Sequence, residues 1–198
     1  MSEFWNNRYS GKEYVYGKTP NEFLKQELNE LNPGRILFLG EGEGRNSVYA
    51  ASQGWTVDAV DSSIEGRNKA KSLAVENKVK INYLVEELSN YSPQENYYDA
   101  VALIFLHLNE SFRKKVYHSA IDALKPGGKI ILESFNKDQL NYNSGGPREE
   151  DQLYSLEEVV EDFIELDFEK LAKETIELNE GQAHKGKASV IRFIAIKP

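Results

Sequence analysis

The chain has 198 residues, a formal net charge of −8 at pH 7 and no cysteine. This length suits one domain with a core of its own. The lack of cysteine excludes disulfides, thiolate metal sites and a cysteine nucleophile. The acidic charge argues against nucleic acid or a membrane surface as the main partner, because both attract basic faces. No apolar run approaches the roughly 20 residues of a membrane-spanning helix, and residues 1–5 show no signal-peptide pattern, so we expect a cytoplasmic protein.

The N-terminal region predicts one helix. Residues 1–19 are rich in aromatic side chains and show no regular periodicity. Thr19 followed by Pro20 has the pattern of an N-cap and a first helical residue. Apolar residues at helical spacing follow, and the Asn-Pro-Gly sequence at 32–34 ends the predicted helix.

From residue 35 onward, strand and helix patterns alternate. Short apolar runs predict strands at 35–39, 56–60, 81–85, 99–104 and 129–134. Helical patterns predict helices at 46–53, 64–76 and 110–124. Alternation of strands and helices with short connections is typical of a parallel, doubly wound sheet.

The last third of the chain has a different pattern. Residues 136–154 are loop-like, and a helix is predicted at 155–163. Two extended segments follow, at about 168–179 and 188–197, with the polar loop 180–187 between them. Two strands joined by a short loop form an antiparallel hairpin.

These elements predict an α/β fold: a mostly parallel, doubly wound, Rossmann-like sheet of seven strands with a C-terminal antiparallel hairpin. No repeat or linker divides the sequence, so we expect a single domain over residues 1–198. Its expected parts are an N-terminal lid and helix (1–33), a cofactor-binding half (34–135) and a substrate-side loop, helix and hairpin (136–198).

The turn after the first predicted strand carries the most informative motif. Gly40, Gly42 and Gly44 stand at alternate positions, and Asp61 closes the next apolar run. Glycines in a strand-to-helix turn let the backbone approach a ligand closely. An acid at the end of the next strand can accept the hydroxyls of a ribose. Together they predict a nucleoside site at the carboxyl edge of a parallel sheet.

The spacing of the glycines separates two classes of cofactor. The dinucleotide fingerprint reads G-x-G-x-x-G, and here Arg45 and Ser47 stand where its third glycine is needed. A pyrophosphate also needs positive charge, whereas Glu41 and Glu43 lie inside this turn. Two carboxylates suit a ligand with a cationic end, such as the ammonium and sulfonium of S-adenosylmethionine. The spacing therefore disfavours the alternative of an NAD(P)-dependent oxidoreductase.

Several features together resemble the class I S-adenosylmethionine-dependent methyltransferases. They are the glycine turn, Asp61, the strand at 98–105, the turn at 124–128 and the closing hairpin. More narrowly, the chain resembles the tellurite-resistance and thiopurine-type branch, which acts on small molecules. The residues that carry this narrower resemblance are Phe4, Trp5, Arg8, Tyr9, Tyr16, Gly17, Pro20, Asn21, Glu41 to Asn46, Gly145 to Pro147, Glu180, Gly181 and His184.

The resemblance implies a set of cofactor-binding residues. The glycine turn would wrap the methionine part, Asp61 would bind the ribose, and Glu87 would read the adenine edge. Many relatives carry an acid two residues before the first glycine; Phe38 stands there in this chain, so we expect Glu41 to approach the ammonium instead. The full predicted set is Arg8, Gly40, Glu41, Gly42, Gly44, Asn46, Asp61, Ser62, Glu87, Leu88 and Ile104.

Candidates for the chemistry of the methyl acceptor come from three loops. His107 follows the fourth strand, at the edge where this architecture places chemistry. His184 lies in the hairpin loop, where the resembled branch often has a histidine and basic residues facing the substrate. We expect Lys185, Lys187 and Arg148 to hold an anionic acceptor, and one of the two histidines to accept or relay a proton.

Missing motifs narrow the acceptor further. Methylation of amide or nucleobase nitrogen is marked by an Asn/Asp-Pro-Pro-aromatic segment after the fourth strand, and residues 104–107 read Ile-Phe-Leu-His instead. No metal-ligand spacing or Ser–His–Asp set is visible. We expect methyl transfer from S-adenosylmethionine to a small molecule, such as a thiol or a tellurite- or selenite-like chalcogen oxyanion, by a monomer or homodimer. The remaining alternative is a protein that binds S-adenosylmethionine without catalysis.

Overall fold

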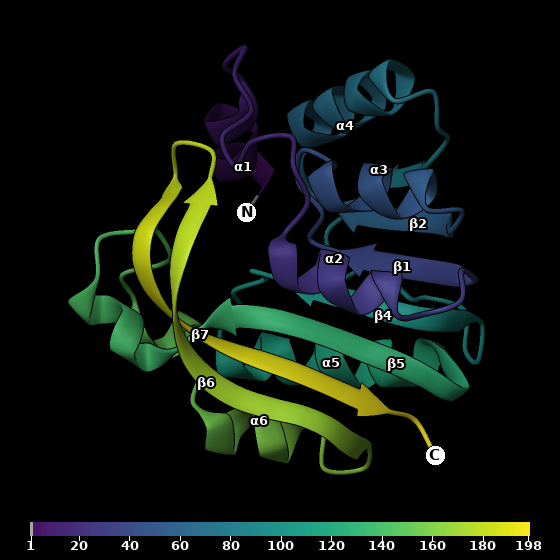
Figure 1. The fold of residues 1–198 in the computed structure, drawn as a ribbon, viewed down its shortest axis with the longest axis vertical. Coiled ribbons are helices and arrows are strands. Elements are labelled where there is room, and N and C mark those ends of the chain that lie inside the picture. The colour runs from purple at the N-terminus through teal and green to yellow at the C-terminus, as the bar shows by residue number, and fades with distance from the viewer. Residues whose placement is uncertain (1) are drawn as a thin grey trace.

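The computed structural model describes residues 2–198, so Met1 of the expected lid lies outside the described residues. A seven-stranded sheet runs through the molecule in the order β3-β2-β1-β4-β5-β7-β6 (Figure 1). Its strands are β1 (Arg35–Leu39), β2 (Thr56–Asp61), β3 (Asn82–Val85), β4 (Tyr98–Ile104), β5 (Leu124–Phe135), β6 (Asp167–Glu180) and β7 (His184–Ile196). Only β7 runs antiparallel to its neighbours β5 and β6. The predicted fold class is therefore confirmed.

Helices cover both faces of this sheet (Figure 1). They are α1 (Ser2–Tyr9), α2 (Glu22–Asn29), α3 (Arg45–Ser52), α4 (Ile64–Glu76), α5 (Glu110–Ala123) and α6 (Leu156–Asp162). Successive side chains of a strand point to opposite faces, so Ile36 and Phe38 of β1 join the core under α2 and α3. Leu37 and Leu39 join the core under α5 and α6. Burial on both faces explains why the parallel strands appear in the sequence as apolar runs rather than as alternating patterns.

The N-terminal residues are more regular than the sequence predicts. Residues 2–9 form helix α1, which packs on α4. The Trp5 and Tyr9 rings stack at 5.4 Å, and the side chain of Asn6 accepts a hydrogen bond from the Ser63 hydroxyl at 2.8 Å. Helix α1 is stabilised by contacts with a helix far away in the sequence, so the periodicity of residues 1–19 alone does not predict it.

The start of α2 is also corrected. Asn21, and not Thr19, is the N-cap, and its Oδ1 accepts from the Leu24 amide at 2.9 Å. Pro20 therefore precedes the cap. Asn21 is buried, and its Nδ2 donates to Glu133 at 2.6 Å and to Glu180 at 3.0 Å. These partners come from β5 and β6, so the choice of cap depends on the tertiary fold.

The hairpin has longer strands and a tighter turn than expected. Glu180 pairs with His184, so the turn is only residues 181–183. β7 pairs with β5 as far as Val190, and residues 184–189 therefore extend past the sheet with β6 alone (Figure 1). The Gln182 and Ala183 amides donate to the Val15 carbonyl at 3.1 and 3.3 Å. The hairpin tip thus meets the N-terminal segment above the carboxyl edge of the sheet.

Two other regions differ in detail from the sequence expectation. The predicted loop 136–154 contains the short 3₁₀ helices Lys137–Asn141 and Glu150–Gln152. β5 begins at Leu124, directly after α5, with a register irregularity where a turn was expected.

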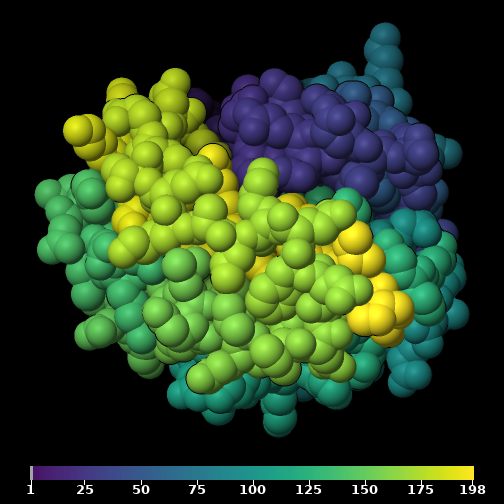
Figure 2. All heavy atoms as spheres, turned by 60° about the horizontal axis from the view of Figure 1, so that its bottom comes forward, coloured from purple at the N-terminus to yellow at the C-terminus, as the bar shows by residue number. Residues whose placement is uncertain are grey.

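On the face in Figure 2, residues of β6 lie beside α2, where Lys170 pairs with Glu27 at 2.7 Å. Among residues 2–198, no helix has the length and apolar character needed to cross a membrane.

Candidate functional site

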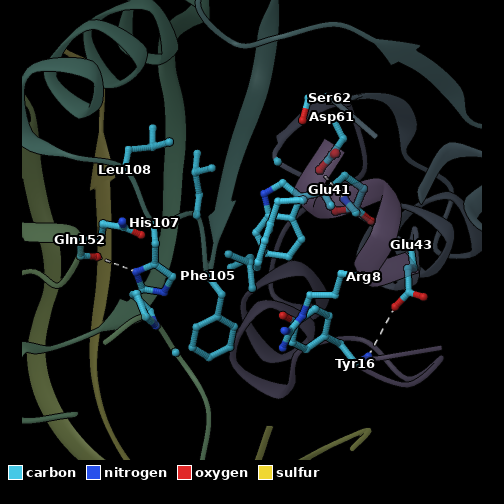
Figure 3. A pocket seen from close by; sticks show the side chains of 18 of the residues that line it. Arg8, Tyr16, Glu41, Glu43, Asp61, Ser62, Phe105, His107, Leu108 and Gln152 are labelled. Atoms are coloured by element: carbon cyan, nitrogen blue, oxygen red, sulfur yellow. Dashed lines mark hydrogen bonds between the residues drawn. The ribbon is translucent and has the colours of Figure 1, made fainter. Parts of the chain in front are cut away.

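A cavity of about 550 Å³ lies at the carboxyl edge of the parallel strands. Its wall is built from α1, the glycine turn, the residues that follow β2, β3 and β4, the end of β5, the loop 146–152 and the hairpin. Figure 3 shows Asp61, Ser62 and Glu41 on one side and His107 with Gln152 on the other. We call the first side, which carries the residues predicted to bind the cofactor, the cofactor wall. We call the second side, which carries the histidines predicted to act on the methyl acceptor, His107 and His184, the acceptor wall.

The glycine turn lies at the cavity, but of the three glycines predicted to bind the cofactor only Gly40 and Gly42 line it. Gly42 has φ +63°, and its amide donates to Asp61 Oδ2 at 2.9 Å. Tyr83 donates its hydroxyl hydrogen to the Gly42 carbonyl at 2.6 Å. Gly44 has φ +88° and no room for a side chain, because a Cβ there would lie 2.4 Å from the Cβ of Ala70. Gly44 therefore lets α4 approach the turn, whereas Gly40 and Gly42 line the cavity.

Asp61 lies at the centre of the cofactor wall. Its second oxygen accepts from the Ser63 amide at 2.8 Å, which fixes the carboxylate at the end of β2. Burial raises its pKa, against the hydrogen bonds from the Ser63 and Gly42 amides. The other predicted residues of this wall, Ser62, Glu87, Leu88 and Ile104, also line the cavity, and Glu87 accepts from the Ser2 amide at 3.2 Å.

Glu41 is a buried carboxyl that caps a helix. Gly44, the N-cap of α3, has no side chain, and Glu41 accepts from the Ser47 amide at 2.6 Å in its place. Burial nevertheless raises the pKa of Glu41 to about 7. The group lines the cavity, and a cation bound beside it would stabilise its ionised form. The approach of Glu41 to the ammonium end of S-adenosylmethionine stays a prediction.

Glu43 has a different function from Glu41. One of its oxygens accepts from the Val15 amide at 2.8 Å, and the other pairs with Lys69 of α4 at 2.7 Å. Its charge therefore attaches the N-terminal segment to α4.

The predicted residues Arg8 and Asn46 both line the cavity. Arg8, which we expect to meet the cofactor carboxylate, has its guanidinium 5.8 Å from the centre of the Tyr16 ring. The Oδ1 of Asn46 accepts from the Asn21 amide at 2.8 Å.

Both candidate histidines lie on the acceptor wall. His107 Nδ1 is 2.9 Å from the Gln152 carbonyl oxygen (Figure 3). His184 Nδ1 is 3.1 Å from Glu180 Oε2. A carbonyl and an ionised carboxylate can only accept, so each Nδ1 carries the hydrogen and each Nε2 is left as an acceptor. Burial lowers the pKa of His107 to about 4 and lowers the pKa of His184 as well, so both rings are neutral near pH 7.

The acceptor wall also contains aromatic rings that the sequence analysis did not single out as site residues. Phe105 has φ +51°, which is rare for a bulky residue and marks strain at a functional edge. Its ring lies 4.6 Å from both Phe135 and His184, and Tyr16 lies 4.5 Å from His184. The strain was not visible in the sequence, because Phe105 extends an apolar run.

A buried polar cluster behind His184 was also missed. Glu180 Oε2 pairs with Arg45 at 2.9 Å, and Asn21 reaches the other oxygen. Burial opposes ionisation of Glu180, but the hydrogen bond from His184 and the charge of Arg45 outweigh it, and its pKa falls to about 2. Asn21, Arg45 and Glu180 are among the residues that carry the narrower family resemblance, but nothing in the sequence indicated that they contact one another.

Three predicted anion-holding residues lie away from the cavity. Lys185 and Lys187 are exposed, and strand alternation places them on the opposite face of β7 from His184. Arg148 is exposed and donates to the Tyr142 carbonyl and Asn143 at 3.0 Å each. None of these three residues lines the cavity. The shorter hairpin turn explains why the two lysines do not face the cavity. Both were expected in a loop, but both lie in strand β7, whose pairing with β6 fixes their direction.

Two sequence comparisons match this chain to methyltransferases. Residues 36–128 match the family described as a methyltransferase domain. A ubiquinone biosynthesis O-methyltransferase from Rickettsia bellii is 28% identical over 127 residues, which cover 63% of this chain and 51% of that protein. The chain thus spans about half the length of this curated relative.

Solved structures share the fold over most or all of the chain. TehB from Haemophilus influenzae has a TM-score of 0.75 at 17% identity, with 100% of this chain and 67% of that chain covered. A methyltransferase from Methanosarcina mazei has a TM-score of 0.70 at 20% identity, covering 85% and 95%. Residues 36–128 thus match a methyltransferase domain, and the fold is the one that these two solved structures share, in agreement with the resemblance seen in the sequence.

We expect Asp61→Ala to weaken binding of S-adenosylhomocysteine by about 1.5–3 kcal/mol, the range for lost hydrogen bonds to a charged group. Calorimetry measures the affinity. Asp58→Ala is the control, because Asp58 lies on the same strand but pairs with Arg35 at 2.7 Å and does not line the cavity. An unchanged dissociation constant in folded Asp61→Ala would reject the ribose contact.

Binding of S-adenosylhomocysteine should strengthen as pH rises through 7. Glu41 is protonated below its pKa of about 7, and only the ionised form attracts the ligand's ammonium. Below pH 7 the affinity should fall by up to about tenfold per pH unit, because one proton must be released on binding. Titrations from pH 5.5 to 8 test this, and Glu41→Gln, which keeps the oxygen that caps α3, should flatten the profile.

Proposed function

We propose that this protein transfers the methyl group of S-adenosylmethionine to a small molecule bearing a thiol or hydroxyl group. The observation that carries the proposal is one cavity with a cofactor wall and, facing it, two neutral histidines with free Nε2 acceptors. A cavity of about 550 Å³ that must also hold the cofactor leaves room only for a small acceptor.

The division of the cavity supports a simple mechanism. When bound, S-adenosylmethionine supplies a methyl group already activated by the sulfonium charge. The glycine turn, Asp61 and Glu41 would fix its position, and the aromatic acceptor wall would exclude water from the nucleophile. His107 or His184 would accept the acceptor's proton, which becomes strongly acidic as the nucleophile gains the methyl group. Even a weakly basic imidazole is then sufficient.

The nature of the acceptor wall favours a protonated nucleophile over a preformed anion. None of the described residues that line the cavity is a lysine. Two arginines line the cavity: Arg45 is paired with Glu180, and Arg8 is the residue expected to meet the cofactor carboxylate. Glu149 also lines this side and adds negative charge. The chalcogen oxyanion expected from the sequence stays a prediction, and the O-methyltransferase named among the relatives gives a reason to test hydroxyl compounds beside thiols.

The proposal is tested by binding and by transfer. Calorimetry should show micromolar binding of S-adenosylhomocysteine and none of NAD. Thiols, phenols, selenite and tellurite are then screened for transfer of labelled methyl groups. Binding of NAD without S-adenosylhomocysteine would overturn the cofactor assignment. Tight cofactor binding without transfer to any compound would favour the alternative of a non-catalytic binding protein.

His184→Ala should lower methyl transfer and leave cofactor affinity nearly intact, because the hairpin contributes to the acceptor wall. A loss of about 10²-fold would identify His184, and not His107, as the group that accepts the proton. Single-turnover measurements at saturating cofactor give the rate. The double substitution of Lys185 and Lys187 by Ala is the matched control on the same strand, and it should turn over like wild type. A loss in the control but not in His184→Ala would restore the lysines as the groups that hold the acceptor.

A further inference from the structure

A buried tyrosine outside the cavity forms hydrogen bonds with the loop that carries His107. Tyr154 is fully buried and follows the 3₁₀ helix Glu150–Gln152. Its hydroxyl donates to the Leu106 carbonyl at 2.7 Å and accepts from the Leu108 amide at 2.9 Å. These two peptide groups flank His107, so one hydroxyl fixes the backbone on both sides of the ring.

The same segment fixes the His107 ring itself. The Gln152 carbonyl, two residues before Tyr154, accepts from His107 Nδ1 at 2.9 Å (Figure 3). His107 Nε2 is buried and has no hydrogen-bond partner among residues 2–198. A buried polar atom without a partner is costly, and here the atom belongs to a ring that lines the cavity. The acceptor's hydroxyl or thiol hydrogen would supply the missing partner.

Tyr154 is in turn held from three directions. Its amide donates to the Phe135 carbonyl at 3.2 Å, and its carbonyl accepts from Asn136 Nδ2 at 3.0 Å. The guanidinium of Arg113 lies 4.7 Å from the centre of its ring, and Arg113 pairs with Asp162 of α6 at 2.6 Å. The end of β5 and helices α5 and α6 therefore set the place of the hydroxyl, and the hydroxyl sets the place of the loop 106–108.

We propose that Tyr154 is the positioning residue of the acceptor site: its hydroxyl, with the Gln152 carbonyl, holds His107 as the Nδ1-protonated form with Nε2 directed to the acceptor's hydrogen. This rests on the proposed methyl transfer to a hydroxyl or thiol. The acceptor's oxygen or sulfur forms the bond to the methyl carbon, the sulfonium sulfur keeps the electron pair of the broken bond, and the acceptor's proton passes to His107 Nε2. Tyr154 itself touches neither ligand, because it does not line the cavity.

The test replaces Tyr154 by Phe, which keeps the ring and its contact with Arg113 but removes both hydrogen bonds. The chain has three histidines, so long-range ¹H–¹⁵N spectra of histidine-labelled protein resolve each ring, and His107→Gln assigns the signal. Wild type should show separate protonated Nδ1 and unprotonated Nε2 signals for His107. Tyr154→Phe should show averaged signals from exchanging tautomers. Unchanged signals in folded Tyr154→Phe would overturn the proposal.

Tyr98→Phe is the matched control. Tyr98 is a buried tyrosine at the opposite end of β4 from the loop 106–108, so its loss should leave the His107 signals unchanged. With an acceptor from the screen, Tyr154→Phe should lower kcat at least tenfold while the dissociation constant of S-adenosylhomocysteine stays within twofold. Equal loss of cofactor affinity would indicate a merely structural residue and would also overturn the proposal.

One measurement needs only the wild-type protein and decides the matter if Tyr154→Phe does not fold. The Leu108 amide should be protected from hydrogen exchange as strongly as the amide of Phe105, which donates to the Glu133 carbonyl at 2.7 Å. Exchange of Leu108 at the rate of an open loop would overturn the proposal. These spectra and exchange rates are independent of transfer, so a failed acceptor screen counts against the proposed function and leaves the positioning of His107 to be judged separately.

Discussion

The architecture of the site depends on one buried carboxylate, that of Glu180 at the end of β6. It contacts three side chains: Arg45 at the start of α3, Asn21 at the N-cap of α2 and His184 at the start of β7. Three parts of the chain that are distant in sequence thus meet at two oxygen atoms. Because a buried charge without partners is unstable, the hairpin tip, the start of α2 and the start of α3 must assemble together.

Asn21 extends this constraint across the sheet. The two hydrogens of its amide bind two different carboxylates, Glu180 and Glu133, while its own oxygen caps α2. Arg192 pairs with Glu133 at 2.6 Å and compensates the second charge. The cluster therefore contains two carboxylates matched by two guanidinium groups, although Arg45 Nη1 is buried without a hydrogen-bond partner among residues 2–198. A buried polar network with matched charges favours one arrangement. The cluster fixes the overhanging part of the hairpin in the register that places His184 in the cavity.

The two walls of the cavity have opposite physical characters, and the fold supplies both. The cofactor wall is acidic, because the glycine turn and the ends of β1 and β2 converge there with Glu41 and Asp61. The acceptor wall is aromatic and uncharged at its histidines, because Phe105 and Phe135 surround His107 and His184. A cationic methyl donor and a neutral acceptor would each meet the environment that suits it, and the N-terminal segment attached through Glu43 lines the same cavity.

The sequence alone determined the class of fold and the cofactor wall. Buried parallel strands produce apolar runs, and the glycine turn with Asp61 is a local motif whose conformation is set by residues near it in sequence. The tertiary structure decided the rest. The Asn21 cap, helix α1, the short hairpin turn and the pairing of Arg45 with Glu180 all depend on partners far away in the chain. The acceptor wall also depends on the tertiary structure. The strained backbone of Phe105, the outward direction of Lys185 and the hydrogen bond from Tyr154 to the His107 loop all result from packing between distant segments, which no local pattern encodes.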